Sequence, residues 1–229
     1  QDTVDFGGRP LTSAGAHDIF VAKYSAVDAH LWSRRFGGPL EDTAWSVSVD
    51  GNGDVLVGGY FEDTADLGGG PLTSNGSSDV FVAKYSGTDG AYRWSTRIGG
   101  PGYECCGQSA LDESGDVLVT GNFDQWADLG GTTLMGEDLG LTIFVAKYRS
   151  ADGALLWAER LGPGFGGAVA AEHDRSVVVA GVYGIFNVFE TLLSAAGARL
   201  WERVQFADVM GGGDPWVSGV VVDSRGNIN

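Results

Sequence analysis

Basic and nucleophilic side chains are scarce in this chain of 229 residues. It has three histidines and two cysteines, and lysine occurs only at positions 23, 84 and 147. With 30 acidic against 14 basic residues, the formal net charge is −16. This excludes nucleic-acid binding by phosphate neutralisation, which needs a basic face, and it disfavours an anionic membrane surface as partner.

Other absences narrow the class of protein further. No apolar run is long enough to predict a membrane span. The two cysteines, Cys105 and Cys106, are adjacent and cannot build a disulfide framework. The histidines fall at unrelated phases of the repeat described below, and no hydrolase elbow, zinc-protease motif or phosphate loop appears. We therefore predict no catalytic residue, no metal site and no cofactor.

The chain is rich in glycine, with 38 residues, and it repeats itself. The pentapeptide Phe-Val-Ala-Lys-Tyr begins at Phe20, Phe81 and Phe144, at spacings of 61 and 63 residues. Two further features recur in phase: a tryptophan at Trp32, Trp94, Trp157 and Trp201, and an Asp-(Phe/Leu)-Gly-Gly motif at Asp5, Asp66 and Asp128. A period of roughly 62 residues is typical of a repeat architecture such as a propeller.

One period contains four short strand signals and no helical periodicity. Strands are predicted over residues 44–49, 55–61, 79–86 and 91–98, with a tight turn at 50–53 and a loop over 62–78. Four antiparallel strands per period are the pattern of a propeller blade. The predicted fold is therefore an all-β propeller of four-stranded antiparallel blades.

The phases of the repeat divide residues 1–229, a single propeller region, into blades. We predict a partial blade at 1–36, blades at 43–99 and 106–162, a shortened blade at 168–206 and the start of another at 216–229. The shortened blade lacks the loop after its second strand, so we expect this loop to be dispensable for folding and free to carry function. Joining the two ends would leave a faulty strand. We therefore expect an open fragment of a longer propeller, rather than a closed four-bladed ring, whose exposed apolar faces self-associate.

Three segments together resemble the SBBP-type β-propeller repeat of large bacterial surface and secreted proteins. They are Phe81-Val-Ala-Lys-Tyr85, Trp94-Ser-x-Arg-x-Gly-Gly100 and Asp112-x-Ser-Gly-x-Val-x-Val-x-Gly121, and the resemblance covers nearly the whole chain. It implies a non-catalytic propeller that is secreted, displayed on the cell surface or periplasmic. Such a propeller is a binding or structural module, and its partner is an unknown protein or carbohydrate. The family offers no residue-level site to carry over.

A second, weaker likeness suggests an alternative function. The segment Tyr85-Ser-x-x-Asp-Gly-x-x-x-Trp94 is similar to the tryptophan-docking motif of PQQ-type quinoprotein propellers, in which the tryptophan packs between blades. Some members of that family carry a disulfide between adjacent cysteines against their cofactor. The resemblance implies, as the alternative, a fragment of a quinoprotein oxidoreductase.

Two groups of residues are weak candidates for a ligand site. The first is the acidic loops, which suit a weakly bound cation or polar ligand but are also explained by solvation: Glu62, Asp63, Asp66, Asp124 and Asp128. The second is Cys105 and Cys106, which the repeat does not require, because Thr43 and Ala44 stand at the same phase. They are expected near the rim of the central channel, where two small buried thiols are the simpler interpretation.

Other recurring residues have structural interpretations. The tryptophan column is predicted to be core between blades, and the lysines are expected to form ion pairs with acidic neighbours. Asp50 to Asp54 resembles a calcium loop, but Phe61 stands where a bidentate glutamate is required. A hairpin turn with Asx-type hydrogen bonds is favoured there.

Overall fold

The computed structural model describes residues 2–137, 140–183, 187–206 and 220. Every regular element in these ranges is a strand, so none of it is a helix able to cross a membrane. Three sheets have four strands each. We number them second to fourth along the chain, because a smaller first sheet precedes them. The second sheet contains β5 (Asp42–Val49), β6 (Val55–Phe61), β9 (Asp79–Tyr85) and β10 (Tyr92–Ile98). The third contains β11 (Cys105–Leu111), β12 (Val117–Phe123), β15 (Thr142–Tyr148) and β16 (Leu155–Pro163). The fourth contains β17 (Phe165–Ala171), β18 (Val177–Tyr183), β19 (Asn187–Leu193) and β20 (Arg199–Phe206).

The first sheet is smaller than the others. It pairs β3 (Ile19–Tyr24) with β4 (His30–Phe36), and a hairpin of β1 (Thr3–Val4) and β2 (Leu11–Thr12) precedes it. In register and sequence, β3 and β4 correspond to β9 and β10 of the second sheet.

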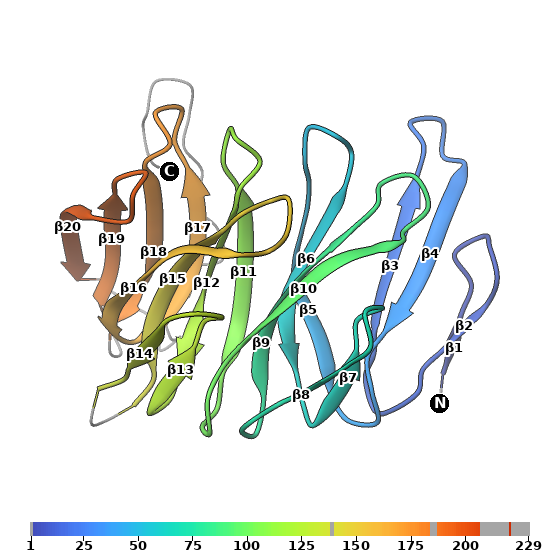
Figure 1. The fold of residues 1–229 in the computed structure, drawn as a ribbon, viewed down its shortest axis with the longest axis horizontal. Coiled ribbons are helices and arrows are strands. Elements are labelled where there is room, and N and C mark those ends of the chain that lie inside the picture. The colour runs from blue at the N-terminus through green and yellow to red at the C-terminus, as the bar shows by residue number, and fades with distance from the viewer. Residues whose placement is uncertain (1, 138–139, 184–186, 207–219, 221–229) are drawn as a thin grey trace.

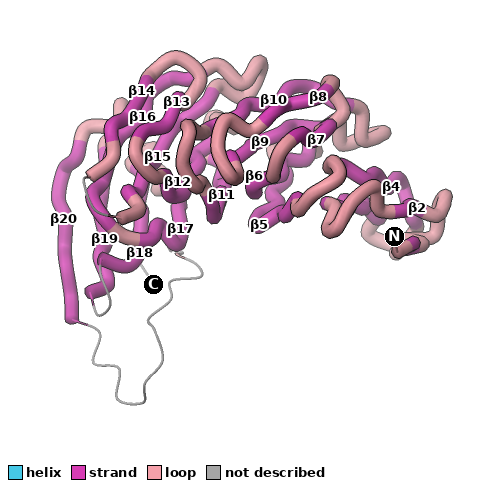
Figure 2. The backbone as a smooth tube through the Cα atoms, turned by 90° about the horizontal axis from the view of Figure 1, so that it is seen from below, coloured by secondary structure: helices cyan, strands magenta, loops and turns pink. Residues whose placement is uncertain are grey.

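The sheets follow one another along an arc, with the first strand of each four-stranded sheet on the concave side (Figure 2). Neighbouring strands within each sheet are antiparallel. From the outermost strand the chain crosses to the innermost strand of the next sheet, as it does between β10 and β11 (Figure 1). This arrangement confirms the predicted fold class, an all-β propeller of antiparallel four-stranded blades. We call the end of the sheets where these crossings lie, at residues 37–41 and 99–104, the crossover face.

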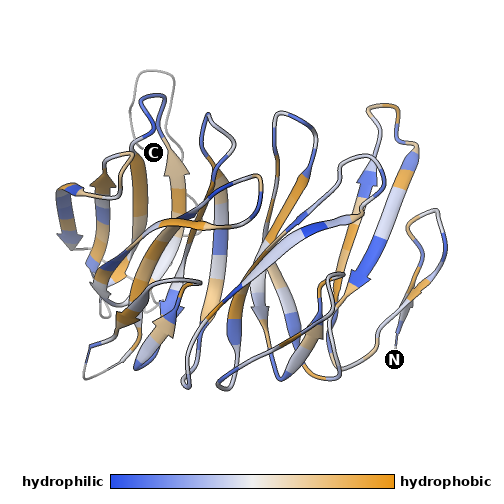
Figure 3. Ribbon diagram, in the orientation of Figure 1, coloured by the Kyte–Doolittle hydropathy of each residue, from blue (hydrophilic) through white to orange (hydrophobic). Residues whose placement is uncertain are grey.

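The core lies between the sheets rather than within one of them. Each of three hydrophobic clusters draws its residues from two neighbouring sheets. Strands β6, β12 and β18 are buried along almost their whole length. Both faces of β6 and of β12 meet a neighbouring sheet. Hydrophobic residues accordingly concentrate on these inner strands, and hydrophilic ones in loops and on outer strands (Figure 3). Each fully buried aliphatic side chain stabilises the fold by about 1.5–3 kcal/mol.

The segment predicted as a plain loop over 62–78 contains a small hairpin. Its strands are β7 (Thr64–Asp66) and β8 (Pro71–Thr73), and the third sheet carries the equivalent β13 (Trp126–Asp128) and β14 (Thr133–Met135). Ala65 and Leu67 enter the core cluster between the first and second sheets. The backbone of Asp66 also exchanges two hydrogen bonds, of 3.2 and 3.3 Å, with Gly37 of the preceding sheet. The hairpin is thus part of the core of the sheets that carry it, although the fourth sheet pairs its strands without one.

Candidate functional site

The recurring tryptophans join each sheet to the next. The indole N–H of Trp94 on β10 donates to the carbonyl oxygen of Ser150 at 2.9 Å, in the turn between β15 and β16. Trp32 and Trp157 repeat this contact with Gly87 and Ala195 of their following sheets. Trp32 and Trp94 are buried and Trp157 is half-buried, which confirms for these three the prediction that the column packs between blades. For Trp201, on the last described strand, it stays a prediction.

A glycine in the docking turn makes room for each indole. Gly153 has a φ of +71°, and a Cβ atom at this position would lie 2.6 Å from the ring of Trp94. Gly90 meets Trp32 and Gly197 meets Trp157 in the same way. Both the backbone conformation and the contact therefore require glycine. The docking motif is explained by blade packing alone.

Two of the three recurring lysines, Lys84 and Lys147, are buried in ion pairs, as predicted. In the described part of the chain Lys23 instead donates to the carbonyl oxygens of Gly53 and Gly87. The ammonium of Lys84 lies 2.8 Å from Oδ2 of Asp50 and donates to Oγ of Ser150 at 2.7 Å, so it links the turns of two sheets. Oδ1 of Asp50 accepts hydrogen bonds from the backbone of Asn52 and Asp54, both at 2.9 Å. Burial by itself raises the pKa of Asp50, but the hydrogen bonds from Lys84 and the backbone outweigh it and lower the pKa. The turn that resembles a calcium loop is thus an Asx-type hairpin turn whose carboxylate binds a lysine.

In the fourth sheet, both partners of this ion pair are replaced by other residues. Leu192 pairs with Val178 in the register in which Lys84 pairs with Leu56. Glu172 stands at the phase of Asp50, and it accepts a hydrogen bond of 2.6 Å from Ser176 instead of binding a lysine. Loss of the lysine with retention of its buried partner would leave an uncompensated charge, which explains why these positions change together.

The predicted acidic candidates do not form one site. Asp66 and Asp128 cap the turns of the small hairpins: Oδ1 of Asp66 accepts from Gly68 at 2.7 Å, and Oδ1 of Asp128 accepts from Gly130 at 3.0 Å. Asp63 is exposed at the entry of its hairpin, with a φ of +53°. Asp124 follows β12 of the third sheet, and its backbone amide donates to the buried carboxylate of Glu104. No group of three or more metal-ligating side chains converges within the ranges that the structure covers.

Glu62 and the two cysteines lie along one stretch of the crossover face. The hydroxyl of Tyr60 donates to Glu41 at 2.7 Å; burial first, and then this hydrogen bond and the nearby Glu62, raise the pKa of Tyr60. Burial also raises the pKa of Tyr103, and the hydrogen bond with Cys105 and the electrostatic interaction with Tyr60 raise it as well. We call this set of residues from two sheets the rim row: Glu41, Tyr60, Glu62, Tyr103, Cys105 and Cys106.

Two buried carboxyl pairs lie beneath the rim row, and sequence reasoning missed both. The pKa of Glu104 is raised to about 7, chiefly by burial and also by the neighbouring Asp79, while the hydrogen bond from the amide of Gly100 opposes the shift. Asp42 repeats this arrangement one sheet earlier: burial raises its pKa to about 6, with Asp18 opposite. Their recurrence at one phase of the repeat, just before Thr43 and Cys105, was the only signal in the sequence.

The cysteines have an unusual local geometry. Their sulfur atoms lie 2.8 Å apart, and Cys106 adopts a φ of +66°. A non-glycine residue in this conformation costs about 1–3 kcal/mol. The strain coincides with a β-bulge, since the register of β11 against β12 shifts between Cys105 and Gln108. Cys105 is buried and Cys106 is half-buried.

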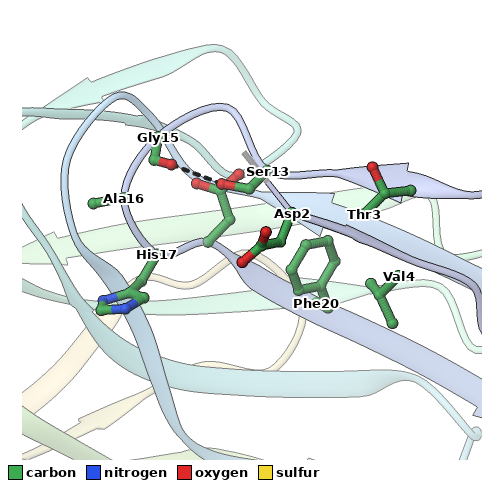
Figure 4. A pocket seen from close by; sticks show the side chains of 9 residues that line it. Asp2, Thr3, Val4, Ser13, Gly15, Ala16, His17 and Phe20 are labelled. Carbon is green, nitrogen blue, oxygen red and sulfur yellow. Dashed lines mark hydrogen bonds between the residues drawn. The ribbon is translucent and has the colours of Figure 1, made fainter.

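Two surface hollows lie elsewhere. One, of about 230 Å³, lies between the β1–β2 hairpin and the start of β3, and is lined by Asp2, Ser13, His17 and Phe20 among others (Figure 4). Another, of about 380 Å³, lies beside Phe165 and Tyr183. Neither contains a predicted site residue.

Comparison with known proteins yields limited likeness. No protein-family model matches the chain. It is 25% identical over 218 residues to an uncharacterised WD repeat-containing protein of Acanthamoeba polyphaga mimivirus, covering 80% of this chain but only 15% of that protein. BamB from Moraxella catarrhalis superposes with a TM-score of 0.45 and 16% identity, over 88% of this chain and 47% of that one. A rhamnogalacturonan lyase of Bacillus licheniformis gives 0.41 and 17%, over 86% and 44%.

Proposed function

We propose that this chain is a non-catalytic blade array that acts as a binding or structural module of a secreted or cell-surface protein. One observation carries the proposal. The side chains that recur in the repeat, such as Trp94 and Lys84, are buried in contacts between sheets. They hold the blades together and are not available to a ligand. The acidic composition and the resemblance to surface-protein repeats support the extracellular location.

The accessible part of the rim row is the proposed binding surface, because most of its residues are not repeated; only Glu62 has a similar residue, Asp124, at its phase. Glu41 stands at the phase of Tyr103, Tyr60 at that of Asn122, and Thr43 at that of Cys105. Residues required for blade packing recur, so residues that vary on one exposed face are free for recognition. The same scaffold thereby presents a different surface in each blade.

Charge indicates the kind of partner. The rim row contributes two carboxylates and two tyrosines, and the chain as a whole carries a charge of −16. Such a surface attracts a cationic protein or peptide over a distance, and tyrosines supply contact area for it. The tryptophan-docking geometry of the described sheets follows from blade packing alone, so it does not favour the quinoprotein alternative over this function.

Fluorescence anisotropy with a labelled arginine-rich peptide tests this proposal. The double variant Glu41→Gln/Glu62→Gln is expected to weaken binding about fivefold, the scale of two exposed ion pairs. The matched control is Asp89→Asn/Asp152→Asn, which removes the same charge from exposed turns at the opposite end of the sheets. Equal weakening by both pairs would show that the peptide only senses net charge, and the rim row would then be rejected as the binding surface.

A further inference from the structure

We propose that Cys105 and Cys106 are a redox-active vicinal pair that closes reversibly to an intrachain disulfide and so alters the contact between the second and third sheets. The proposal is independent of the binding role of the rim row. It rests on the geometry of the pair, on the unequal environments of the two thiols and on the contacts of the bulge that contains them.

The backbone already brings the two sulfurs together. Their separation of 2.8 Å exceeds the length of a disulfide bond, about 2.05 Å, by less than an ångström. The positive φ of Cys106 is particular to this sheet, because Ala44 and Gly166, at the equivalent bulges, do not share it. Consecutive Cα atoms are about 3.8 Å apart, closer than in most disulfides. The closed form is therefore strained and readily reduced, as reversible disulfides are.

The two thiols are suited to different steps of thiol–disulfide exchange. Cys106 is the more accessible, and its hydrogen bond with Cys105 lowers the pKa of Cys106, which favours the thiolate. The same hydrogen bond, together with burial, raises the pKa of Cys105. Thiolate is the attacking species in disulfide exchange. Cys106 is thus the attacking residue and Cys105 the resolving residue.

A low-molecular-weight disulfide such as glutathione disulfide is the oxidant. The thiolate of Cys106 attacks one of its sulfurs, which forms a mixed disulfide and releases one glutathione thiolate. Cys105 then gives its proton to that thiolate, and its sulfur attacks Sγ of Cys106 and displaces the second glutathione thiolate, which takes up a proton from water. Two protein thiols are oxidised by two electrons, and one glutathione disulfide is reduced to two thiols.

The bulge is packed against the preceding sheet, so closure has a structural effect. A Cβ atom on Gly107 would lie 2.7 Å from the carbonyl oxygen of Gly59 on β6. The hydroxyl of Ser46 on β5 hydrogen-bonds Oγ of Ser109 at 2.9 Å and accepts from its backbone amide at 3.0 Å. A shift of the backbone at Cys105 and Cys106 is transmitted directly to these contacts, because no space separates the two sheets.

The test uses the full chain, glutathione disulfide as oxidant and dithiothreitol as reductant. Intact mass spectrometry should show the loss of two hydrogens with no added glutathione, and its reversal by dithiothreitol. Cys105→Thr should instead accumulate a glutathione adduct on Cys106. Cys106→Ala should react at least about tenfold more slowly, because the remaining thiol is buried and protonated. Both substitutions take the residue found at the same phase of the second sheet, so the fold is expected to tolerate them.

Hydrogen exchange supplies the structural readout. Oxidation should change exchange of the amides in β5, β6 and β11 in the native chain, and should leave the Cys105→Thr/Cys106→Ala variant unchanged. A native chain that accumulates glutathione adducts without ring closure would overturn the proposal. Ring closure without any change in exchange would overturn its second part, the altered contact between the sheets.

Discussion

At the scale of single residues, Glu104 is the side chain whose surroundings fit its charge least well. It is buried, it approaches Asp79, and its Oε1 atom has no hydrogen-bond partner in the described part of the chain. Arg97 forms its ion pair with Asp79, not with Glu104. A proton shared between the two carboxyl groups relieves their repulsion, as in other close carboxylate pairs. The carboxyl pair at this contact between blades therefore binds a proton as the pH falls below about 7.

This proton makes stability depend on pH. The folded-state pKa of Glu104, about 7, lies above its usual value of 4.5, so the native state binds the proton more tightly than the unfolded state. The stabilisation is complete below about pH 4.5 and is lost as the pH rises through 7. We expect this group to lower the free energy of unfolding by on the order of 2 kcal/mol across that window. Asp42 acts in the same direction, up to about pH 6.

Urea denaturation at a series of pH values measures the effect. Glu104→Gln should flatten the slope between pH 4.5 and 7, because the amide mimics the protonated acid and does not titrate. The control is Glu159→Gln, on the exposed surface of β16, which should keep the slope of the native chain. A Glu104→Gln protein with an unaltered slope would show that the pair holds no proton at these pH values.

At the scale of elements, the small hairpins β7–β8 and β13–β14 connect neighbouring sheets. In the third sheet, Leu129 after β13 is fully buried, and its carbonyl oxygen accepts a hydrogen bond of 3.1 Å from Tyr148 on β15. Asp128 exchanges backbone hydrogen bonds of 3.1 Å with Gly99 of the second sheet. Each hairpin thus covers its own sheet and holds the outer strand of the sheet before it.

Substitutions within one hairpin separate its buried and exposed sides. Leu129→Ala should lower the free energy of unfolding by about 2–5 kcal/mol, since it removes buried methyl groups and leaves a cavity. Met135→Ala, on β14, should change it by less than about 0.5 kcal/mol, because that side chain is 64% exposed. Chemical denaturation measures both. Similar small losses would mean that the hairpin is a surface loop, as the repeat suggests on first inspection.

At the scale of the whole molecule, the arc exposes apolar surface on its concave side. Three large residues of the innermost strand β5 are exposed by half or more: Trp45 by 51%, Val47 by 67% and Val49 by 55%. In the described ranges β3 pairs only with β4, so its other edge presents free backbone groups. Apolar patches and free strand edges both favour association.

We therefore expect the purified chain to self-associate. Static light scattering should give a mean mass above 23.9 kDa that rises with concentration. The double variant Val47→Lys/Val49→Lys should bring the mass toward that of the monomer, because it places charge on the exposed strand. Val27→Lys, in the turn between β3 and β4, adds charge at another exposed valine and should leave association largely unchanged. A native chain that is monomeric at every concentration would contradict this expectation.

Much of the fold follows from local patterns that the repeat makes visible. The strand predicted over 55–61 is β6 itself, and the other three predicted strands of that sheet differ from the observed ones by one or two residues at an end. Alternation along the strand placed Lys84 opposite Ala83, and the phase of Trp94 indicated a contact between blades. These features recur because they join neighbouring blades, so three copies of the lysine motif and four tryptophans in one chain reveal them without an alignment.

The partners of most other contacts between sheets could not be predicted in the same way. Asp79 meets Glu104, Asp66 meets Gly37 and Ser46 meets Ser109 only because consecutive sheets stack in the arc. Such partners lie tens of residues apart and no periodic signal connects them, since their pairing depends on how closely two sheets approach. The cysteine pair shows the division most clearly. Its adjacency can be read directly from the chain, but the close approach of the two sulfurs arises from a strained bulge that packing against the preceding sheet holds in place.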